Sequence, residues 1–304
     1  MSDANVPSVA PLILGIDLGG TAIKLGCCDP QGKCMRSLTI PTPQPSTPKA
    51  VLAAIASAVH EIDPQRTIPA IGIGMPGPTD IAGRIARIAI NLDDWHEVPL
   101  ADWVEAATNR PTTLANDANC AGLGEALYGV GQPFKNMILL TLGTGVGGAI
   151  ILNGDLFTGR SGSAGELGLI TLRPDGPPCN SGNQGSLEQF ASVQAIRRDW
   201  HCEPHELAER ARDQDEGAIA FWQDYGRNLG AGLASLIYVL TPEAVILGGG
   251  IAASADLFLP WVEAEIERRV MPTSREGLVI LPAALGNQAG MIGAAQLARQ
   301  RFGY

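Results

Sequence analysis

The sequence predicts two related α/β domains with a cleft between them. Two strand-rich segments, one beginning at Leu12 and the other at Ile138, are each followed by helix-like sequence. Each segment also contains a glycine-rich turn flanked by apolar runs, and the two turns lie about one domain length apart. A length of 304 residues is typical of about two domains, so we expect one domain in each segment.

The first segment predicts strands that turn back on one another and are followed by helices. In order, its predicted elements are strands at 12–17, 22–28 and 34–40, a proline-rich loop, a helix near 48–62, a strand from Ile71 to the loop at Gly77, a helix near 99–107, a strand at 112–115 and a helix from Asn116 to about Tyr128. We expect an N-terminal domain over residues 1–117, joined by the C-terminal helix 288–304.

The second segment repeats this order. Its predicted elements are a strand from Ile138, a glycine turn, a second strand, an irregular stretch to Gly185, helices near 186–200, 205–212 and 215–240, a strand at 244–247, a helix near 254–270, a strand at 278–281 and a helix near 288–301. We expect this C-terminal domain to span residues 118–287.

Composition excludes several classes of partner. The formal net charge is −10 and no basic cluster overrides it, which argues against a nucleic-acid or anionic membrane surface. The longest apolar run, Leu229 to Leu240, is too short to span a bilayer, and residues 1–10 lack the basic region of a secretion signal. Six cysteines without a C-x-x-C pair suit a reducing compartment. We therefore expect a cytoplasmic protein that acts on small molecules.

The two glycine turns are candidate phosphate-binding hairpins. Glycine lets the backbone approach an anion and turn its amide N–H groups toward it. The candidate contacts are Asp17, Gly19, Gly20, Thr21 and Lys24 in the first turn, and Gly143, Thr144, Gly145 and Gly147 in the second. A tight hairpin alone explains either turn equally well, but the two together, with Asp17 and Lys24, favour a nucleotide.

Other phosphate motifs fit less well. Residues 143–148 match the G-x-G-x-x-G pattern of dinucleotide sites, with Glu166 near the expected position of a ribose-binding acid. That site needs a helix directly after the glycines, whereas residues 149–152 predict a strand followed by a turn. The chain also lacks a Walker A motif and the protein-kinase motifs.

Six motifs, in order and spacing, resemble those of the ROK family of sugar kinases, open reading frames and repressors. They are Asp17-Leu-Gly-Gly-Thr21, Asn116-Asp-Ala-Asn119, Leu142-Gly-Thr-Gly-Val-Gly-Gly148, Gly165-Glu-Leu-Gly168, Ser186-Leu-Glu188 and Leu247-Gly-Gly-Gly250. The resemblance implies an actin and hexokinase type of fold (ribonuclease H-like), in which two α/β domains close over ATP and a sugar. ROK repressors carry an added DNA-binding domain, for which there is no room before Leu12, so we expect the enzyme branch.

The resemblance also implies roles for individual residues. Asp117 would be the catalytic base and Asn116 a sugar contact, although a helix N-cap explains both by position alone. Glu166 and Glu188 would accept hydrogen bonds from sugar hydroxyls. The structural alternatives are a solvated loop acid for Glu166 and, for Glu188, a capping box from Ser186 to Gln189. Further candidates are Asn91 and Gly77, which loop architecture explains equally well, and Gly249 and Gly250, which would lie against the adenosine.

The chain departs from the family at its zinc motif. Typical ROK kinases bind zinc through a histidine and three cysteines, but here the corresponding positions are Leu169, Cys179, Ser181 and Ser186. One thiol cannot replace four nitrogen or sulfur ligands. We expect no zinc, with the loop held by packing, by prolines 174, 177 and 178, and by a Ser186 cap. Leu169 also replaces a family sugar contact.

The sequence thus predicts an ATP-dependent glucokinase that phosphorylates the 6-hydroxyl of glucose, with Mg²⁺ near Asp17. A kinase for fructose, mannose, an N-acetyl sugar or a cyclitol is an alternative within the class. A catalytically silent sugar-binding regulator is an alternative from another class, and polyphosphate is an alternative donor. The resemblance suggests a homodimer.

Overall fold

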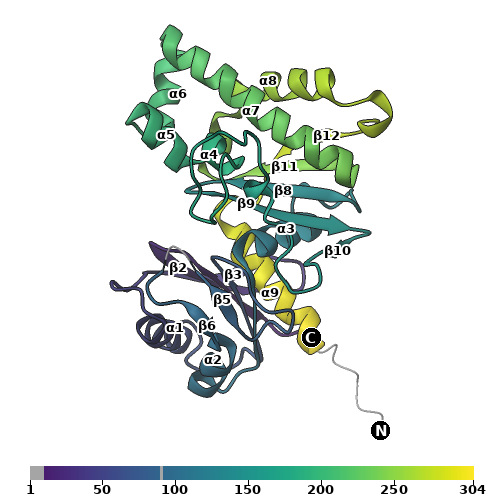
Figure 1. The fold of residues 1–304 in the computed structure, drawn as a ribbon. Coiled ribbons are helices and arrows are strands. Elements are labelled where there is room, and N and C mark those ends of the chain that lie inside the picture. The colour runs from purple at the N-terminus through teal and green to yellow at the C-terminus, as the bar shows by residue number, and fades with distance from the viewer. Residues whose placement is uncertain (1–9, 90–91) are drawn as a thin grey trace. The chain divides into compact units, whose positions relative to one another are not determined.

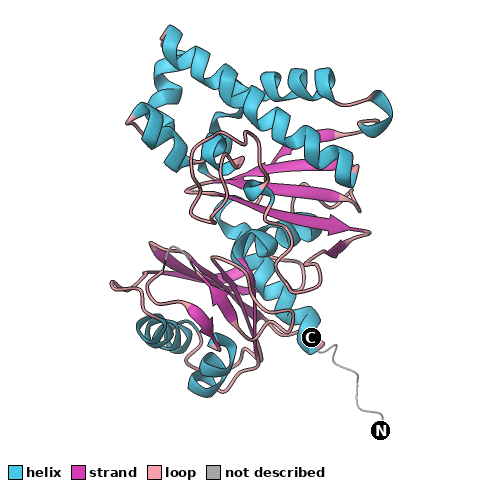
Figure 2. Ribbon diagram, in the orientation of Figure 1, coloured by secondary structure: helices cyan, strands magenta, loops and turns pink. Residues whose placement is uncertain are grey.

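The computed structural model describes residues 10–89 and 92–304. The chain divides into two compact units: unit 1 runs to Cys120 and includes Gly290–Tyr304, and unit 2 is Ala121–Ala289. Each unit contains a five-stranded sheet of mixed direction with helices packed on it (Figures 1 and 2). No helix within the described residues has the length and apolar character needed to cross a membrane.

The five strands of the unit 1 sheet occur along the chain where they were predicted. The sheet is β3-β2-β1-β4-β7, formed by β1 (Ile13–Leu18), β2 (Ala22–Cys28), β3 (Cys34–Pro41), β4 (Ile71–Met75) and β7 (Thr112–Asn116). The helices are α1 (Pro48–Ile62), α2 (Leu100–Thr108) and α9 (Ala289–Phe302), and α3 (Asp117–Tyr128) begins here. The antiparallel meander β1-β2-β3 confirms the prediction. A small ribbon of β5 (Ala86–Ile88) and β6 (His96–Val98) was not predicted, because three-residue strands are too short to produce a period.

The two faces of the unit 1 sheet carry different residues. Leu14, Ile16 and Leu18 are fully buried in one core with α1 and α2. On the opposite face a Cβ at Gly15 would lie 1.7 Å from the carbonyl oxygen of Met291, in α9. Gly72, beside Gly15 on β4, meets α9 in the same way. Glycine on this face therefore lets α9 pack directly against the strand backbones.

Unit 2 is built on the sheet β10-β9-β8-β11-β12. Its strands are β8 (Met137–Leu142), β9 (Val146–Leu152), β10 (Asp155–Leu156), β11 (Ala244–Gly248) and β12 (Val279–Pro282). Its helices are α4 (Glu188–Ala191), α5 (Val193–Trp200), α6 (Pro204–Arg212), α7 (Glu216–Leu240) and α8 (Ala255–Arg269), with short 3-10 turns η1 (Leu167–Leu169), η2 (Gly250–Ser254), η3 (Pro272–Ser274) and η4 (Gly286–Gln288). Alternation along β8 separates the faces: Ile138 and Leu140 share a core with α7 and α8, whereas Leu139 packs with Ala126 of α3.

The prediction of a single helix near 186–200 in unit 2 is wrong. The segment near 186–200 forms two helices, α4 and α5, separated at Ser192. Ser192 has extended backbone angles, and its hydroxyl accepts a hydrogen bond from the Ala195 N–H at 3.1 Å. Because a serine N-cap satisfies a donor that would otherwise lack a partner, it starts a new helix at this position.

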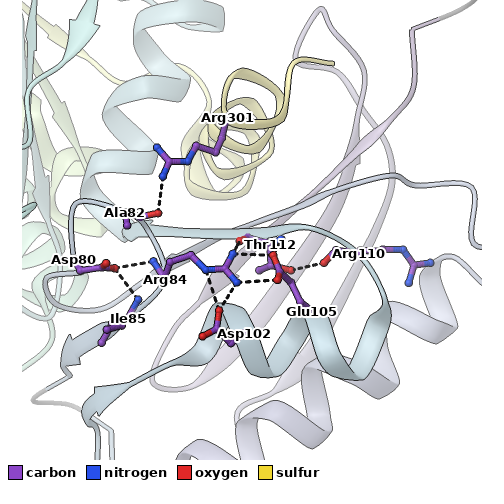
Figure 3. Close-up of polar contacts among 9 residues, drawn as sticks. All are labelled: Asp80, Ala82, Arg84, Ile85, Asp102, Glu105, Arg110, Thr112 and Arg301. Atoms are coloured by element: carbon purple, nitrogen blue, oxygen red, sulfur yellow. Dashed lines mark hydrogen bonds and ion pairs between the residues drawn. The ribbon is translucent and has the colours of Figure 1, made fainter.

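An arginine in unit 1 ties a turn, a helix and a strand together (Figure 3). Arg84 bonds both oxygens of Glu105 at 2.7 and 2.8 Å, contacts Asp102, and donates to the carbonyl of Thr112 at 2.7 Å. The turn that carries Arg84 is itself capped by Asp80, which accepts from the Arg84 N–H at 2.7 Å. These contacts fix the positions of α2 and β7 relative to the turn at 80–84.

A buried ion pair lies at the end of α1. Arg110 and Asp63 are 2.7 Å apart, and their side chains are only 7% and 1% exposed. Burial would raise the pKa of the Asp63 carboxyl, but hydrogen bonds from the N–H groups of Ile68 and Thr67 and from Arg110 outweigh it and lower the pKa to about 2. The folded state therefore favours the ionised carboxylate.

This pair predicts an acid-sensitive contribution to stability. The folded pKa lies below the unfolded value of about 3.9, so the contribution is complete above about pH 4 and is lost as the pH falls toward 2. Asp63→Asn should lower the free energy of unfolding by about 3–5 kcal/mol at pH 7, because Arg110 stays buried without its counter-charge. It should also flatten the loss of stability between pH 4 and 2, as measured by urea unfolding.

The matched control is Asp256→Asn, which breaks an exposed ion pair with Arg212. It should cost at most about 1 kcal/mol. Equal effects of the two substitutions would contradict the assigned role of burial.

Candidate functional site

Both glycine turns are hairpins, as predicted. In each, the chain returns as an antiparallel strand, so neither opens the helix that a dinucleotide site requires. The first turn closes with a hydrogen bond from Gly19 N–H to the carbonyl of Ala22 at 3.0 Å. Thr42 braces the turn from outside, since its hydroxyl donates to the Gly19 carbonyl at 2.6 Å and its N–H to the Thr21 carbonyl at 3.0 Å. Gly20 and Thr21 remain exposed at the tip.

Asp17 and Lys24 face each other beside this first turn. They are direct partners in the β1–β2 register, and Lys24 Nζ lies 3.3 Å from Asp17 Oδ2. A Cβ at Gly290, in the first turn of α9, would lie 3.1 Å from the carboxyl carbon of Asp17. Burial raises the pKa of Asp17, and the charge of Lys24 and its hydrogen bond partly offset this. The N-terminus of α9 also favours a negative charge there.

Asn116 and Asp117 lie at the junction of β7 and α3. Asn116 Oδ1 accepts from the Asn119 N–H at 3.1 Å, so Asn116 carries the helix-capping role. Its amide nitrogen donates to the Gly77 carbonyl at 3.3 Å. Asp117 is instead the first residue of α3, and its Oδ1 accepts from the Ala118 N–H at 2.8 Å. The N-cap role therefore accounts for Asn116. It does not account for Asp117, whose role depends on its chemistry.

Two candidate sugar contacts of unit 1 remain, Gly77 and Asn91. Gly77 has φ +87°, and a Cβ there would lie 2.1 Å from the Ile88 carbonyl oxygen, so loop architecture accounts for this glycine. Asn91 lies outside the residues that the structure describes.

The second glycine turn is anchored on two sides. Gly143 N–H bonds the Gly145 carbonyl at 3.0 Å, and the Gly143 carbonyl accepts from the first N–H of α5, that of Val193, at 2.8 Å. Gly249 has φ +85°, and a Cβ there would lie 2.4 Å from the carbonyl oxygen of Leu142, just before the turn. Three other candidates belong to the same region of unit 2. Thr144 is at the exposed tip of the turn, and Gly147 in β9 pairs with Thr141 in β8. A Cβ at Gly250 would have no other described residue within 4 Å.

Glu188 joins the second turn to the loop that precedes α4. Its Oε2 accepts from the Val146 N–H at 3.1 Å, and a Cβ at Gly145 would lie only 2.3 Å from that oxygen. Its Oε1 accepts from the Cys179 thiol at 3.6 Å. Gly145 therefore leaves room for the Glu188 carboxylate in this position.

The capping box that offered a structural alternative for Glu188 is wrong. Ser186 is fully buried, and its hydroxyl has no hydrogen-bond partner among the described residues. Gln189 N–H bonds the Ser186 carbonyl at 3.0 Å instead of the hydroxyl. The loop is therefore not held by a Ser186 cap, because the Ser186 carbonyl, and not its hydroxyl, accepts the hydrogen bond from the Gln189 N–H.

Glu166 lies near Glu188 and is half-buried. Burial raises the pKa of Glu166, and the charge of Glu188 raises it further. This environment differs from that of a solvated loop acid. Two carboxylates beside a glycine turn present several hydrogen-bond acceptors and no donors, an arrangement suited to a ligand with neighbouring hydroxyl groups.

The four positions of the family zinc motif do not fit a zinc ion. Leu169 has no ligand atom, and Cys179 is already bonded to Glu188 and to the Ser181 hydroxyl, which lies 3.2 Å from its sulfur. Zinc favours four nitrogen or sulfur ligands, and serine hydroxyls are poor substitutes. Asn183 supports this loop instead, since its side-chain nitrogen donates to the Leu169 carbonyl at 2.8 Å.

We therefore predict that metal analysis of the purified protein finds well below one zinc per chain. A triple variant, Leu169→His with Ser181→Cys and Ser186→Cys, restores the ligand types and is the matched control. It should gain zinc under the same purification. One bound zinc per wild-type chain, or unfolding of the wild type by a zinc chelator, would contradict the prediction.

Three contacts of the site were not predicted from sequence. Thr42 braces the first turn, the Val146 N–H holds Glu188, and Cys179 bonds the same carboxylate. Only Cys179 carried a signal, as the remaining cysteine of the family zinc motif. The other two contacts join residues 23 and 42 positions apart, a separation at which local patterns carry no information.

Comparison with known proteins agrees with the motifs. The ROK family profile matches residues 13–301. Glucokinase of Thermotoga maritima is 33% identical, covering 96% of this chain and 98% of that protein, and glucokinase of Streptomyces coelicolor is 37% identical, covering 95% and 98%. The structure of a ROK family glucokinase from Streptomyces griseus in complex with glucose and AMPPNP has a TM-score of 0.84 at 35% identity, covering 95% of this chain and 99% of that one. The fold is thus the actin and hexokinase type, and the chain belongs to the ROK family.

Proposed function

We propose that this protein is an ATP-dependent sugar kinase, and specifically a glucokinase that transfers the γ-phosphoryl group to the 6-hydroxyl of glucose. The observation that carries the proposal is the Glu188 carboxylate, which is bonded to the backbone of the second glycine turn and adjoins Glu166. A sugar-binding carboxylate and a phosphate-binding turn are thereby joined. The similar glucokinase that binds glucose and AMPPNP supports both ligands.

The sugar would be held mainly by Glu166 and Glu188. Ionised carboxylates accept hydrogen bonds from hydroxyl groups, and such charge-assisted bonds are stronger than neutral ones. Asn116 is the third proposed contact, through the capacity that remains on an amide already bonded to Gly77 and Asn119. The Leu169 side chain has no hydrogen-bonding group that would be left unpaired. The enzyme should therefore tolerate an altered hydroxyl at the sugar position next to it.

Asp117 is the proposed general base. Its carboxylate would take the proton of the attacking hydroxyl as the oxygen bonds to the γ-phosphorus and the bond to the β-phosphate oxygen breaks. The first turn of a helix holds a short carboxylate in a defined position, and the bond to the Ala118 N–H restricts it further.

The nucleotide phosphates would lie against the N–H groups of residues 18–21 and 143–148, with Lys24 as a positive charge. Gly249 and Gly250 would adjoin the adenosine. Asp17 offers the oxygen ligand that Mg²⁺ prefers, directly or through water. When bound, Mg²⁺ neutralises phosphate charge. The protein would use Mg²⁺ with ATP and would need no zinc.

A panel of sugars tests the reaction and its specificity. Glucose, fructose, mannose, N-acetyl sugars and a cyclitol would each be incubated with ATP and Mg²⁺, with ADP release as the readout and polyphosphate as an alternative donor. Glucose should give the highest kcat/KM. Absence of turnover with every sugar, despite sugar binding, would favour the non-catalytic regulator instead.

Asp117→Asn should retain the fold and lower kcat by roughly 10²–10⁴, because the attacking hydroxyl loses its proton acceptor. The amide can still accept from the Ala118 N–H, so thermal stability should change little. Asp175→Asn is the control, since Asp175 is an exposed loop acid, and its kcat should be unchanged. Near-normal turnover in Asp117→Asn would exclude Asp117 as the base.

Glu188→Gln should raise KM for glucose roughly 10- to 100-fold and leave KM for ATP nearly unchanged, because a charged acceptor is lost while the contact to Val146 can persist. Glu216→Gln is the matched control: Glu216 is also an acid at the first position of a helix, but is exposed. If Glu188→Gln lowers only the melting temperature, its role is structural and Glu188 leaves the proposed sugar site.

A further inference from the structure

Unit 2 has a concave surface whose lining residues are separate from its glycine turn at 143–148. We propose that it is a binding site for a phosphorylated small molecule, and that this ligand regulates sugar binding. The hollow has a volume of about 660 Å³ and is lined by four arginines, Arg173, Arg227, Arg268 and Arg269, together with Glu265, Asn228 and a few small or uncharged residues. We call it the arginine hollow.

Two adjacent helices and a loop build the arginine hollow. On α7, the lining residues Arg227, Ala231 and Ser235 are four positions apart and so share one face. On α8, Glu265, Arg268 and Arg269 are three and four positions apart and share the facing side. The two helices lie side by side in Figure 1. The segment 171–173 closes the third side, so the groups come from three separate parts of unit 2.

Specific contacts orient these arginines. Arg173 lies over the ring of Phe190, 4.8 Å from its centroid, and donates to Asn228 at 2.7 Å. Arg227 lies over Trp261 at 4.9 Å. Stacking on an aromatic ring restricts the rotation of both arginine side chains. Because they are already ordered, they lose less conformational entropy when they bind an anion.

Glu265 orients the remaining two guanidinium groups. It accepts from Arg268 at 2.6 and 3.0 Å and also contacts Arg269, and Glu265 itself is only 7% exposed. One buried carboxylate thus holds two arginines at the rim of the hollow.

The hollow carries more positive charge than its surroundings neutralise. Four guanidinium groups face one lining carboxylate and, with Asp224 outside the lining, two carboxylates in all, which leaves an excess of two positive charges on a chain whose net charge is −10. Asp224 pairs with Arg227 at 2.7 Å from outside the lining, whereas the partners of Arg173 among the described residues are uncharged. Arginine binds phosphate through paired N–H donors, so this excess favours a phosphorylated ligand.

Size narrows the class of ligand. Pockets for small molecules are typically about 300–1,000 Å³, and a single phosphate ion would leave most of the arginine hollow empty. A phosphorylated sugar and a short chain of phosphates share the required chemistry, and the experiment below separates them.

The backbone connects the arginine hollow to the proposed sugar site. The N–H groups of Leu172 and Arg173 both donate to the Gly185 carbonyl, at 2.8 and 3.0 Å, and a Cβ at Gly185 would lie 1.6 Å from the Arg173 carbonyl oxygen. Gly185 immediately precedes Ser186, and the Ile170 carbonyl accepts from Leu187 at 2.9 Å. Movement of Arg173 toward an anion would therefore act on the segment that carries Glu188. This regulatory part rests on the proposed function, whereas binding itself does not.

Calorimetry with tripolyphosphate and with a hexose 6-phosphate, each in the presence of saturating AMPPNP and glucose, tests the site. At least one probe should bind, and the double variant Arg227→Gln with Arg268→Gln should weaken that binding at least about tenfold. Arg212→Gln, an exposed arginine paired with Asp256 outside the hollow, should leave it unchanged. The probe that binds identifies the ligand as a phosphate chain or a phosphorylated sugar.

Absence of binding by both probes, or equal binding by the double variant and the wild type, would overturn the site. The regulatory part is tested by KM for glucose with and without the bound probe. KM should change at least twofold in the wild type and remain constant in the double variant. Binding without any change in KM would overturn the regulation, and absence of turnover altogether would bear only on the proposed kinase function.

Discussion

The packing of α9 on the glycine face of β1 and β4 is the contact on which unit 1 depends. It brings the last helix of the chain against the first strand, with Gly15 and Gly72 in direct contact with the α9 backbone. A side chain at either position would push the helix away, because the partner atoms are backbone and cannot rotate aside. The same contact places Gly290 against the Asp17 carboxylate. One steric requirement thus supports both the core and a group proposed to act on the nucleotide.

In unit 2 the comparable contact is made by a charged group. Glu188 is bonded to the backbone at Val146 and lies where a side chain at Gly145 would collide with it. The glycine turn and the loop around Cys179 are consequently held by one carboxylate. A movement of the loop around Cys179 would therefore shift the glycine turn at 143–148 as well. This arrangement explains how a loop without the zinc ligands of the family can still have a defined structure.

Charge is distributed unevenly over this acidic protein. Carboxylates collect where a neutral, hydroxyl-rich ligand is proposed to bind, and their mutual repulsion contributes to the raised pKa of Glu166, after burial. Arginines collect on α7, α8 and the segment 171–173. The segment 171–173 is hydrogen-bonded to Gly185, which lies three residues before Glu188 in the chain. The two clusters would attract ligands of different charge, and the backbone at Gly185 is the physical connection between them.

The sequence by itself determined the elements whose signals are local. Hydrophobic period and turn chemistry predicted the meander at 12–40, the return of both glycine turns as strands, and the long helices. The motifs also identified the family. Tertiary structure decided the rest. It assigned the helix cap to Asn116 and divided the helix near 186–200 at Ser192. It also left the Ser186 hydroxyl without a hydrogen-bond partner in the part of the chain that the structure describes. It also placed Glu166 beside Glu188 and gathered the arginine hollow from three segments. These features depend on contacts between residues distant in the chain or on the choice among competing hydrogen-bond partners, and a local pattern contains neither.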